Sequence, residues 1–261
     1  MSIWLRLLAI AVLLAAPGCG SRDRGTVWQV SSISALMAGD YEGSTTCAEL
    51  LKHGDFGLGT FDALDGEMIV EHGIVYRAAA DGSVSRVDPS RKTPFATVTF
   101  FNKVDCVTTP AGGLDLAALE RMLDNMTAAK NTPCAVMVSG HFVRMQVRSV
   151  PRQEKPYPPL AEAVKRQTVS ELDDAVGTIV GFRMPAWAQG VNVPGLHLHF
   201  ISADGTRGGH VLSFKADAAS VLVDLCREVV VRVPATEGFR RLNLTPPKDA
   251  ELDRVENPAH N

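Results

Sequence analysis

The stretch from Gly195 to Phe214, GLHLHFISADGTRGGHVLSF, constrains the fold more than any other part of the chain. Apolar side chains alternate with histidines in its first half, which predicts a β-strand with one apolar face, formed by Leu196, Leu198 and Phe200. Asp204-Gly205 is typical of a two-residue hairpin turn. The stretch therefore predicts a hairpin of two antiparallel strands.

Three histidines lie in this hairpin. Because each strand residue advances about 3.3 Å, His197 and His199 share a face and lie about 6.6 Å apart. A turn at Asp204-Gly205 pairs His199 with His210, with Cβ atoms about 4.5–5.5 Å apart. A bulge at residues 208–209 would move His210 by one position.

Three imidazoles on one face can supply the nitrogen ligands of a catalytic zinc site with one position left open. Iron, copper, cobalt and nickel accept the same ligands. For a single histidine we would favour a buried side chain that hydrogen bonds to the backbone. Three together, opposite an apolar face, favour a metal site.

The composition narrows the class of partner. The chain has 261 residues, of which 46% are hydrophobic and 21% charged, as in a folded globular protein. A formal charge of −3, with both signs mixed along the chain, argues against binding nucleic acid or a membrane surface. Small molecules are the expected partners.

The N-terminus has the pattern of an export signal. Arg6 precedes an apolar run over 7–16, which is too short to span a membrane, and Ala16-Pro17-Gly18-Cys19 resembles a bacterial lipobox. We expect a signal peptide over 1–19 of the lipoprotein type, with a lipid on Cys19, and a tether over 20–27. The protein would be periplasmic or membrane-anchored, with secretion as the alternative.

The remaining pattern predicts a mixed α and β protein with largely antiparallel or mixed sheets. Helices are expected over 31–38, 44–53, 114–129 and 156–172, strands over 57–61, 68–70, 74–76, 95–101 and 135–150, and either element over 221–233. Two domains, 28–150 and 151–261, are expected.

Cysteines and two charged residues carry weaker signals. Cys47, Cys106, Cys134 and Cys226 lack Cys-x-x-Cys spacing, so they are buried thiols or disulfide partners without an assigned function. Glu67 follows an Asp65-Gly66 turn and begins a strand, where it faces either a polar cavity or solvent. Arg148 alone is typical of a surface residue.

Many short segments together resemble the α-acetolactate decarboxylase family. They include HGDFGLGTF at 53–61, LDGE at 64–67, TPFA at 93–96, RSVP at 148–151, KPY at 155–157, GFRMP at 181–185, GVNVPGLHLHF at 190–200 and GGHVL at 208–212. The match follows the family's order over nearly the whole mature chain.

The resemblance implies one zinc ion per chain on His197, His199 and His210, with Glu67, Arg148 and Glu256 as catalytic residues. Thr60 and Arg148 would contact the substrate. The implied reaction converts 2-acetolactate into (R)-acetoin and CO2, with zinc as a Lewis acid on an enediolate intermediate. Position 183 is arginine, where an aromatic residue is frequent in the family.

The resemblance also implies a site between two domains, a C-terminal tail that returns over it, and is compatible with a homodimer. Two other functions use the same histidines: a metal-binding lipoprotein of the cell envelope without catalysis, and a zinc hydrolase. A metal store has no use for Glu67, Arg148 and Glu256 together, so the enzyme is favoured. Only the resemblance argues against the hydrolase.

Overall fold

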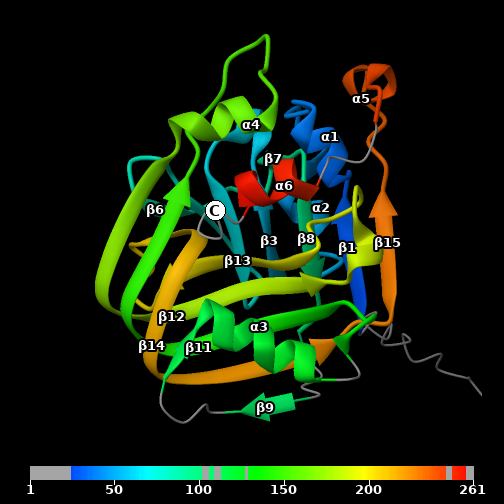
Figure 1. Ribbon diagram of the computed structural model, residues 1–261. Helices are drawn as coiled ribbons and strands as arrows, with labels where there is room; N and C mark the ends of the chain where they lie inside the picture. Colours follow the sequence, from blue (N-terminus) through cyan, green and yellow to red (C-terminus); the bar gives the residue numbers. More distant parts are fainter. Residues whose placement is uncertain (1–24, 102–105, 109–112, 127–128, 245–248, 257–261) are drawn as a thin grey trace, which may run out of the picture.

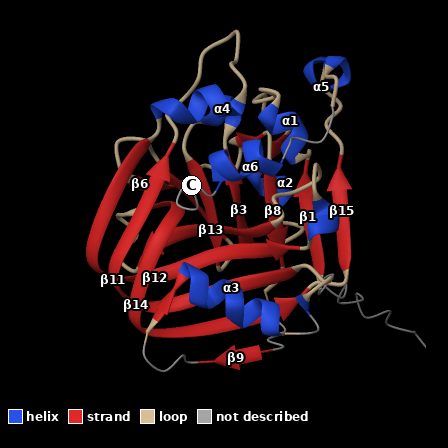
Figure 2. Ribbon diagram, viewed as in Figure 1, coloured by secondary structure: helices blue, strands red, loops and turns tan. Residues whose placement is uncertain are grey.

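The computed structural model describes residues 25–101, 106–108, 113–126, 129–244 and 249–256. Two β-sheets make up most of the molecule, and the strands of one run across those of the other (Figure 1). Short helices gather at one end of the molecule, while the longest helix lies against the second sheet (Figure 2). The expected class, a mixed α and β fold with largely antiparallel sheets, is confirmed.

The first sheet has the strand order β15-β1-β8-β3-β4-β5-β6, in which only β1 and β15 run parallel. Its strands are β1 Thr26–Val30, β3 Phe56–Thr60, β4 Glu67–Glu71, β5 Ile74–Ala78, β6 Val84–Arg86, β8 Ala96–Thr99 and β15 Glu228–Arg232. A separate pair consists of β2 Thr45–Thr46 and β7 Lys92–Thr93. Strands β3, β4, β5 and β8 confirm four predicted strands.

The second sheet is formed by β9 Cys106–Thr108, β10 Leu114–Asp115, β11 Cys134–Ser149, β12 Thr168–Met184, β13 Gly195–Ser202 and β14 Gly208–Leu225. Because β13 pairs with both β12 and β14, strands β11 to β14 close into a ring. Register shifts between β11 and β14 allow these long strands to curve. Phe142 packs edge to face against Phe200 and Phe214 in the core of this sheet.

The helices are α1 Ile33–Met37, α2 Cys47–Leu50, α3 Leu116–Asn125, α4 Leu160–Ala163, α5 Glu237–Arg241 and α6 Asp249–Glu256, with 3-10 turns η1 Asp62–Leu64, η3 Val164–Arg166 and η4 Ala186–Ala188. Those predicted over 31–38, 44–53 and 114–129 are present in shorter form. Helix α3 begins at Leu116 because the Asp115 side chain accepts a hydrogen bond from the Ala118 amide at 2.7 Å.

The helix predicted over 156–172 is present only over 160–166, as α4 followed by η3, and the prediction is wrong at both ends. Residues 168–172 instead pair with residues 145–149 of β11. Thr168 and Val169 are β-branched and favour a strand when a partner strand is available. The apolar segment 221–233, left open between helix and strand, is the end of β14 followed by β15.

The structure can be compared with the predicted end of the tether and with the predicted division into two domains. The tether expected over 20–27 ends earlier, because Thr26 and Val27 are buried in β1 between β8 and β15. Both sheets take strands from both sides of residue 150, since β11 joins β12 to β14 and β15 joins β1. The division into domains 28–150 and 151–261 stays a prediction.

Residues 1–24, with the expected signal peptide and Cys19, lie outside the described residues. No helix in the described part is long and apolar enough to cross a membrane. Cys47, Cys134 and Cys226 are buried free thiols, and burial raises the pKa of each to about 11, 11 and 12. The Cys106 side chain lies outside the described residues.

Candidate active site

The histidine hairpin forms with the predicted register. His199 of β13 pairs directly with His210 of β14, followed by Phe200 with Gly209, so no bulge displaces His210. The Asp204 carboxylate orders the turn by accepting hydrogen bonds from the amide and hydroxyl of Thr206. The three imidazole centroids lie 5.1 to 5.3 Å apart.

Hydrogen bonds to carbonyl groups orient two of the rings. His199 Nδ1 donates to the Met68 carbonyl at 2.8 Å, and His210 Nε2 donates to the Glu256 carbonyl at 2.8 Å. A carbonyl can only accept, so these nitrogens carry the protons and leave His199 Nε2 and His210 Nδ1 with free lone pairs in the neutral rings. Such bonds fix the orientation of histidine ligands at metal sites.

Burial keeps all three rings neutral. Burial, with Arg148 nearby, lowers the pKa of His197 from its ordinary 6.5 to about 3. Burial also lowers the pKa values of His199 and His210 well below 6.5, and the neighbouring charges of the cluster act in the same direction. Neutral imidazoles are the form that binds metal ions.

Glu67 reaches the same place from the first sheet, at the start of β4. Its Oε2 lies 3.7 Å from His199 Nε2, and its Oε1 lies 3.7 Å from Arg148 Nη1. Burial raises the pKa of Glu67 from 4.5 to about 7, which Arg148 partly opposes and Glu256 reinforces. This carboxyl group can therefore gain or lose a proton near neutral pH.

Arg148 lies on β11 directly opposite His210 and is buried, unlike the surface arginine that its sequence alone suggested. Its Nη2 donates to the Val255 carbonyl at 3.0 Å and lies 3.9 Å from Glu256 Oε2. One guanidinium thus lies between the carboxylates of Glu67 and Glu256, with its Nε lacking a hydrogen-bond partner.

Glu256 is the last residue of α6, which returns to the site from the C-terminal end of the chain. Its Oε2 lies 3.6 Å from His197 Nε2 and 3.9 Å from His210 Nδ1. Burial raises the pKa of this carboxyl group, and Arg148 opposes the shift. Leu252 and Val255 of α6 pack into the apolar cluster beside the site.

These side chains line a small cavity of about 30 Å³. Thr60 also lines it and donates from Oγ1 to the Gly66 carbonyl at 2.8 Å. All seven residues proposed from the sequence thus lie together, His199 through its contact with Glu67 and the other two rings. Sequence reasoning missed the apolar wall of the cavity, which consists of Leu36, Leu64, Phe95, Val150 and Leu160.

The histidines can hold a metal ion. Their ligand atoms all lie within 4.8 Å of one another. His197 Nδ1, His199 Nε2 and Glu256 Oε2 are buried without hydrogen-bond partners, although buried polar atoms are nearly always paired. An ion at this position would satisfy such atoms. Among the described residues, no other cluster of potential ligands has this geometry.

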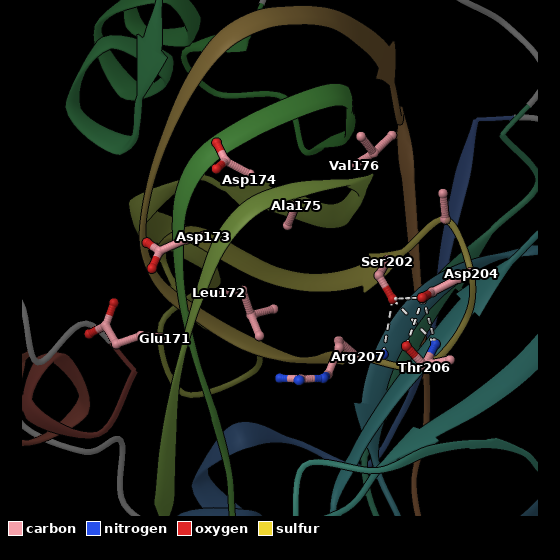
Figure 3. A pocket seen from close by; sticks show the side chains of 11 residues that line it. Glu171, Leu172, Asp173, Asp174, Ala175, Val176, Ser202, Asp204, Thr206 and Arg207 are labelled. Atoms are coloured by element: carbon pink, nitrogen blue, oxygen red, sulfur yellow. Dashed lines mark hydrogen bonds between the residues drawn. The ribbon is translucent and has the colours of Figure 1, made fainter.

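A larger depression of about 520 Å³ lies elsewhere, along β12 and the β13–β14 turn. Its acidic side chains spread along the strand instead of converging, and Asp204 is occupied by the hydrogen bonds of the turn (Figure 3). This depression is therefore open and lacks the converging donors and acceptors of the histidine site.

Arg183 faces away from the cavity. Its guanidinium donates to the Ala129 carbonyl at 2.7 Å and to Asp124 of α3 at 2.5 Å. It does not line the cavity. The arginine at this position therefore attaches the end of α3 to β12.

The fold and site define a class of protein. Three neutral histidines, two carboxyl groups with raised pKa values and one buried guanidinium converge on one small cavity between the two sheets. Burying these groups together is costly unless they serve a function. The arrangement is that of an enzyme with a histidine centre suited to a metal ion.

Comparison with known proteins specifies the family. The α-acetolactate decarboxylase family matches residues 27–246. The chain is 44% identical to the α-acetolactate decarboxylase of Methylococcus capsulatus over 231 residues, which are 88% of each chain. It is 40% identical to that of Methanosarcina mazei over 92% of this chain and 83% of the relative.

A solved structure agrees with this assignment. The crystal structure of α-acetolactate decarboxylase from Bacillus subtilis superposes with a TM-score of 0.86 at 36% identity, covering 89% of this chain and 99% of the other. The chain therefore belongs to the α-acetolactate decarboxylase family, and it is an enzyme of this kind. The matched family range ends before Glu256, which the structure brings to the site through α6.

Proposed function

We propose that the protein converts 2-acetolactate into (R)-acetoin and CO2 with one zinc ion bound by His197, His199 and His210. The observation that carries this proposal is the convergence of three neutral imidazoles with Arg148 between two carboxyl groups. The orphaned nitrogen atoms fit a metal ion, and nitrogen ligands with one open position suit zinc. A bound zinc ion supplies a Lewis acid for the oxygen atoms on which negative charge develops.

Arg148 binds the anionic substrate. The guanidinium is buried, permanently charged and forked, so it can pair with two oxygen atoms at once. Its hydrogen bond to the Val255 carbonyl and its position between two carboxyl groups fix its orientation. Negative charge that develops on the substrate during loss of CO2 is stabilised by this preorganised donor.

Glu67 and Glu256 handle the proton that replaces CO2. Burial raises the pKa of both carboxyl groups, that of Glu67 to about 7, so Glu67 can hold a proton near neutral pH and Glu256 holds one more readily than an exposed glutamate does. The two groups approach from different elements, β4 and α6. Delivery from one fixed side would produce a single enantiomer of acetoin.

Apolar side chains form part of the cavity wall and lower the polarity around the charged groups. Leu64, Phe95 and Leu160 leave space for few polar contacts other than those to the charged groups. In such surroundings electrostatic interactions are stronger than in water. This environment favours loss of CO2, which spreads charge, and does not favour the hydrolase or metal-storage alternatives.

Four further features stay proposals. Export, a lipid on Cys19 and a periplasmic or anchored location rest on residues 1–19, and a homodimer rests on the family resemblance. Fractionation of the native cells tests the location. A cytosolic protein with an intact N-terminus would contradict export.

Turnover tests the proposed function. The purified protein is incubated with racemic 2-acetolactate while CO2 and the chirality of acetoin are measured, before and after chelation and with zinc restored. We expect (R)-acetoin from the wild type, none above the spontaneous rate after chelation or with His199→Ala, and recovery only in the chelated wild type. Unchanged turnover in protein shown by metal analysis to be free of metal would contradict the metal mechanism.

A further inference from the structure

The loop between β3 and β4 has an unusual backbone. Ala63 and Leu64 both have positive φ, 61° and 58°, in the left-handed region that alanine and leucine rarely adopt. The loop connects two groups of the active site, Thr60 at the end of β3 and Glu67 at the start of β4. Leu64 itself lines the cavity. The strained residues therefore lie in a loop that forms part of the active site, and backbone strain is common at such sites.

Asp65 follows the strained pair and is held from outside the cavity. One carboxylate oxygen pairs with Arg77 of β5 and the other with Arg91, which precedes β7. The Asp65 carbonyl accepts a further hydrogen bond from Arg77 Nε at 2.8 Å. The Asp65 side chain is only 14% exposed but does not line the cavity, so these contacts serve the loop.

Arg91 and a third arginine, Arg152, make further contacts with the loop. The Arg91 guanidinium lies 4.8 Å from the centre of the Phe61 ring, at the start of the loop. Arg152 approaches Asp65 at 3.9 Å and Asp62 at 3.5 Å. Asp65 is thus the point at which guanidinium groups from three separate segments meet the loop.

We propose that Asp65 is a positioning residue of the decarboxylase: it keeps Ala63 and Leu64 in the left-handed conformation, so that Leu64 and Glu67 face the cavity. Without its charge, the backbone of the loop loses the paired arginines and can relax toward negative φ. Such a change would turn the Leu64 side chain and shift Glu67, three residues along. This inference rests on the proposed function for its effect on turnover, but not for its effect on the loop.

Asp65→Asn tests the role of the charge while keeping the shape of the side chain. We expect kcat to fall at least tenfold with KM changed less than threefold, because Glu67 acts on the reacting group. Metal content should stay at that of the wild type. Asp81→Asn is the matched control, since Asp81 is an exposed aspartate bonded to Ser83 in the turn between β5 and β6, and should leave kcat unchanged.

A second substitution separates positioning from general stability. Glycine adopts positive φ without strain, so Ala63→Gly should restore most of the kcat of Asp65→Asn while changing the wild type less than twofold. A variant that had simply lost stability would not recover in this way. If Asp65→Asn does not fold, Arg91→Gln replaces it, with a smaller loss and the same recovery expected.

Hydrogen exchange gives a readout that does not depend on turnover. The Ala63 amide donates to the Tyr41 carbonyl and the Gly66 amide to the Val150 carbonyl, so both report on the loop. We expect their exchange to be at least tenfold faster in Asp65→Asn and to return toward the wild-type rate with Ala63→Gly. Unchanged exchange, or a loss of kcat that Ala63→Gly does not restore, would overturn the inference. Wild-type protein without turnover would instead overturn the proposed function, and the exchange rates would still decide the role of Asp65.

Discussion

The three histidines determine how the metal-free site responds to acid. Each pKa is lowered by burial in the folded protein but returns to about 6.5 in the unfolded chain. Between pH 6.5 and about 3 the unfolded chain therefore binds protons that the folded protein does not. The free energy of unfolding should therefore decrease as the pH is lowered through this window, by about 1 kcal/mol per pH unit for each such proton.

Glu67 and Glu256 act in the opposite sense. Their raised pKa values let the folded protein take up protons before the unfolded chain, Glu67 from about pH 7 downward, which offsets part of the loss. Urea unfolding of the chelated protein between pH 7.5 and 4.5 measures the net slope. His199→Ala should make the decline shallower, and an identical slope in this variant would show that the histidines do not cause it.

Arg148 cannot be replaced by lysine if it binds as proposed. A single ammonium group cannot extend between Glu67, Glu256 and two substrate oxygen atoms, although it keeps the charge. We expect Arg148→Lys to lower kcat/KM about 100-fold, as for loss of a preorganised donor. Steady-state kinetics measure this.

Arg183→Lys is the matched control for Arg148→Lys. Arg183 is also on a long strand of the second sheet, but its partners belong to α3 and the segment after it. It should keep kcat/KM within about threefold of the wild type, because sites without shared partners act independently. Equal losses in the two variants would argue against a specific role for Arg148.

At the scale of single residues, geometry within the hairpin was predictable and contacts across the molecule were not. A turn centred on Asp204-Gly205 predicts that His199 faces His210, and the structure has this pair, although the connection between β13 and β14 is longer than two residues and spans 203–207. Glu67 and Arg148 showed only weak local signals, and the family resemblance was needed to place them. Leu64 and Phe95 could not be identified because an apolar residue that lines a cavity has the same local pattern as a core residue.

Helix α6 completes the site and should be required for turnover. It supplies Glu256, and its Val255 and Glu256 carbonyls accept hydrogen bonds from Arg148 and His210. Deleting residues 250–261 should lower kcat at least about 100-fold, because a catalytic group and the cover of the cavity are both lost. Full activity in this truncation would remove Glu256 from the mechanism.

Stability measurements show whether the truncated protein remains folded. Loss of buried Leu252 and Val255 should cost about 3–6 kcal/mol, which is large for one helix but leaves both sheets intact. Glu256→Gln keeps the helix and removes only the acid, so it should lose turnover with little change in unfolding temperature. A chain ending at residue 259, which keeps the Glu256 carbonyl as part of a peptide bond, is the matched control and should behave as the wild type.

At the scale of elements, the local sequence pattern can predict a different secondary structure from the one that long-range strand pairing produces. The predicted helix over 156–172 is limited to 160–166, because residues 168–172 pair with β11. Pairing along the 17-residue strand β12 outweighs the helical spacing of a few apolar side chains. Helix α6 was not predicted as a helix, because its sequence is largely polar and its two buried apolar residues, Leu252 and Val255, are too few to give a helical pattern.

For the whole molecule, the site joins the two sheets. Glu67 and the Met68 carbonyl come from the first sheet, while the histidines and Arg148 come from the second. The sequence indicated that separate parts of the chain would meet here, but only the structure shows that both sheets contain strands from both halves. A ligand bound at this position should therefore stabilise both sheets together.

Zinc binding provides the test of that coupling. At a free zinc concentration 1,000 times the Kd, binding to the folded state alone stabilises it by about 4 kcal/mol, or roughly 10 °C for a chain of this size. Because His199 donates to the Met68 carbonyl, an ordered imidazole also restrains β4. Hydrogen exchange should therefore slow in β4 as well as in β13 and β14, and His199→Ala should show neither effect. Protection confined to β13 and β14 would mean that the ion stabilises the hairpin alone, and that the two sheets are held together by packing without help from the metal.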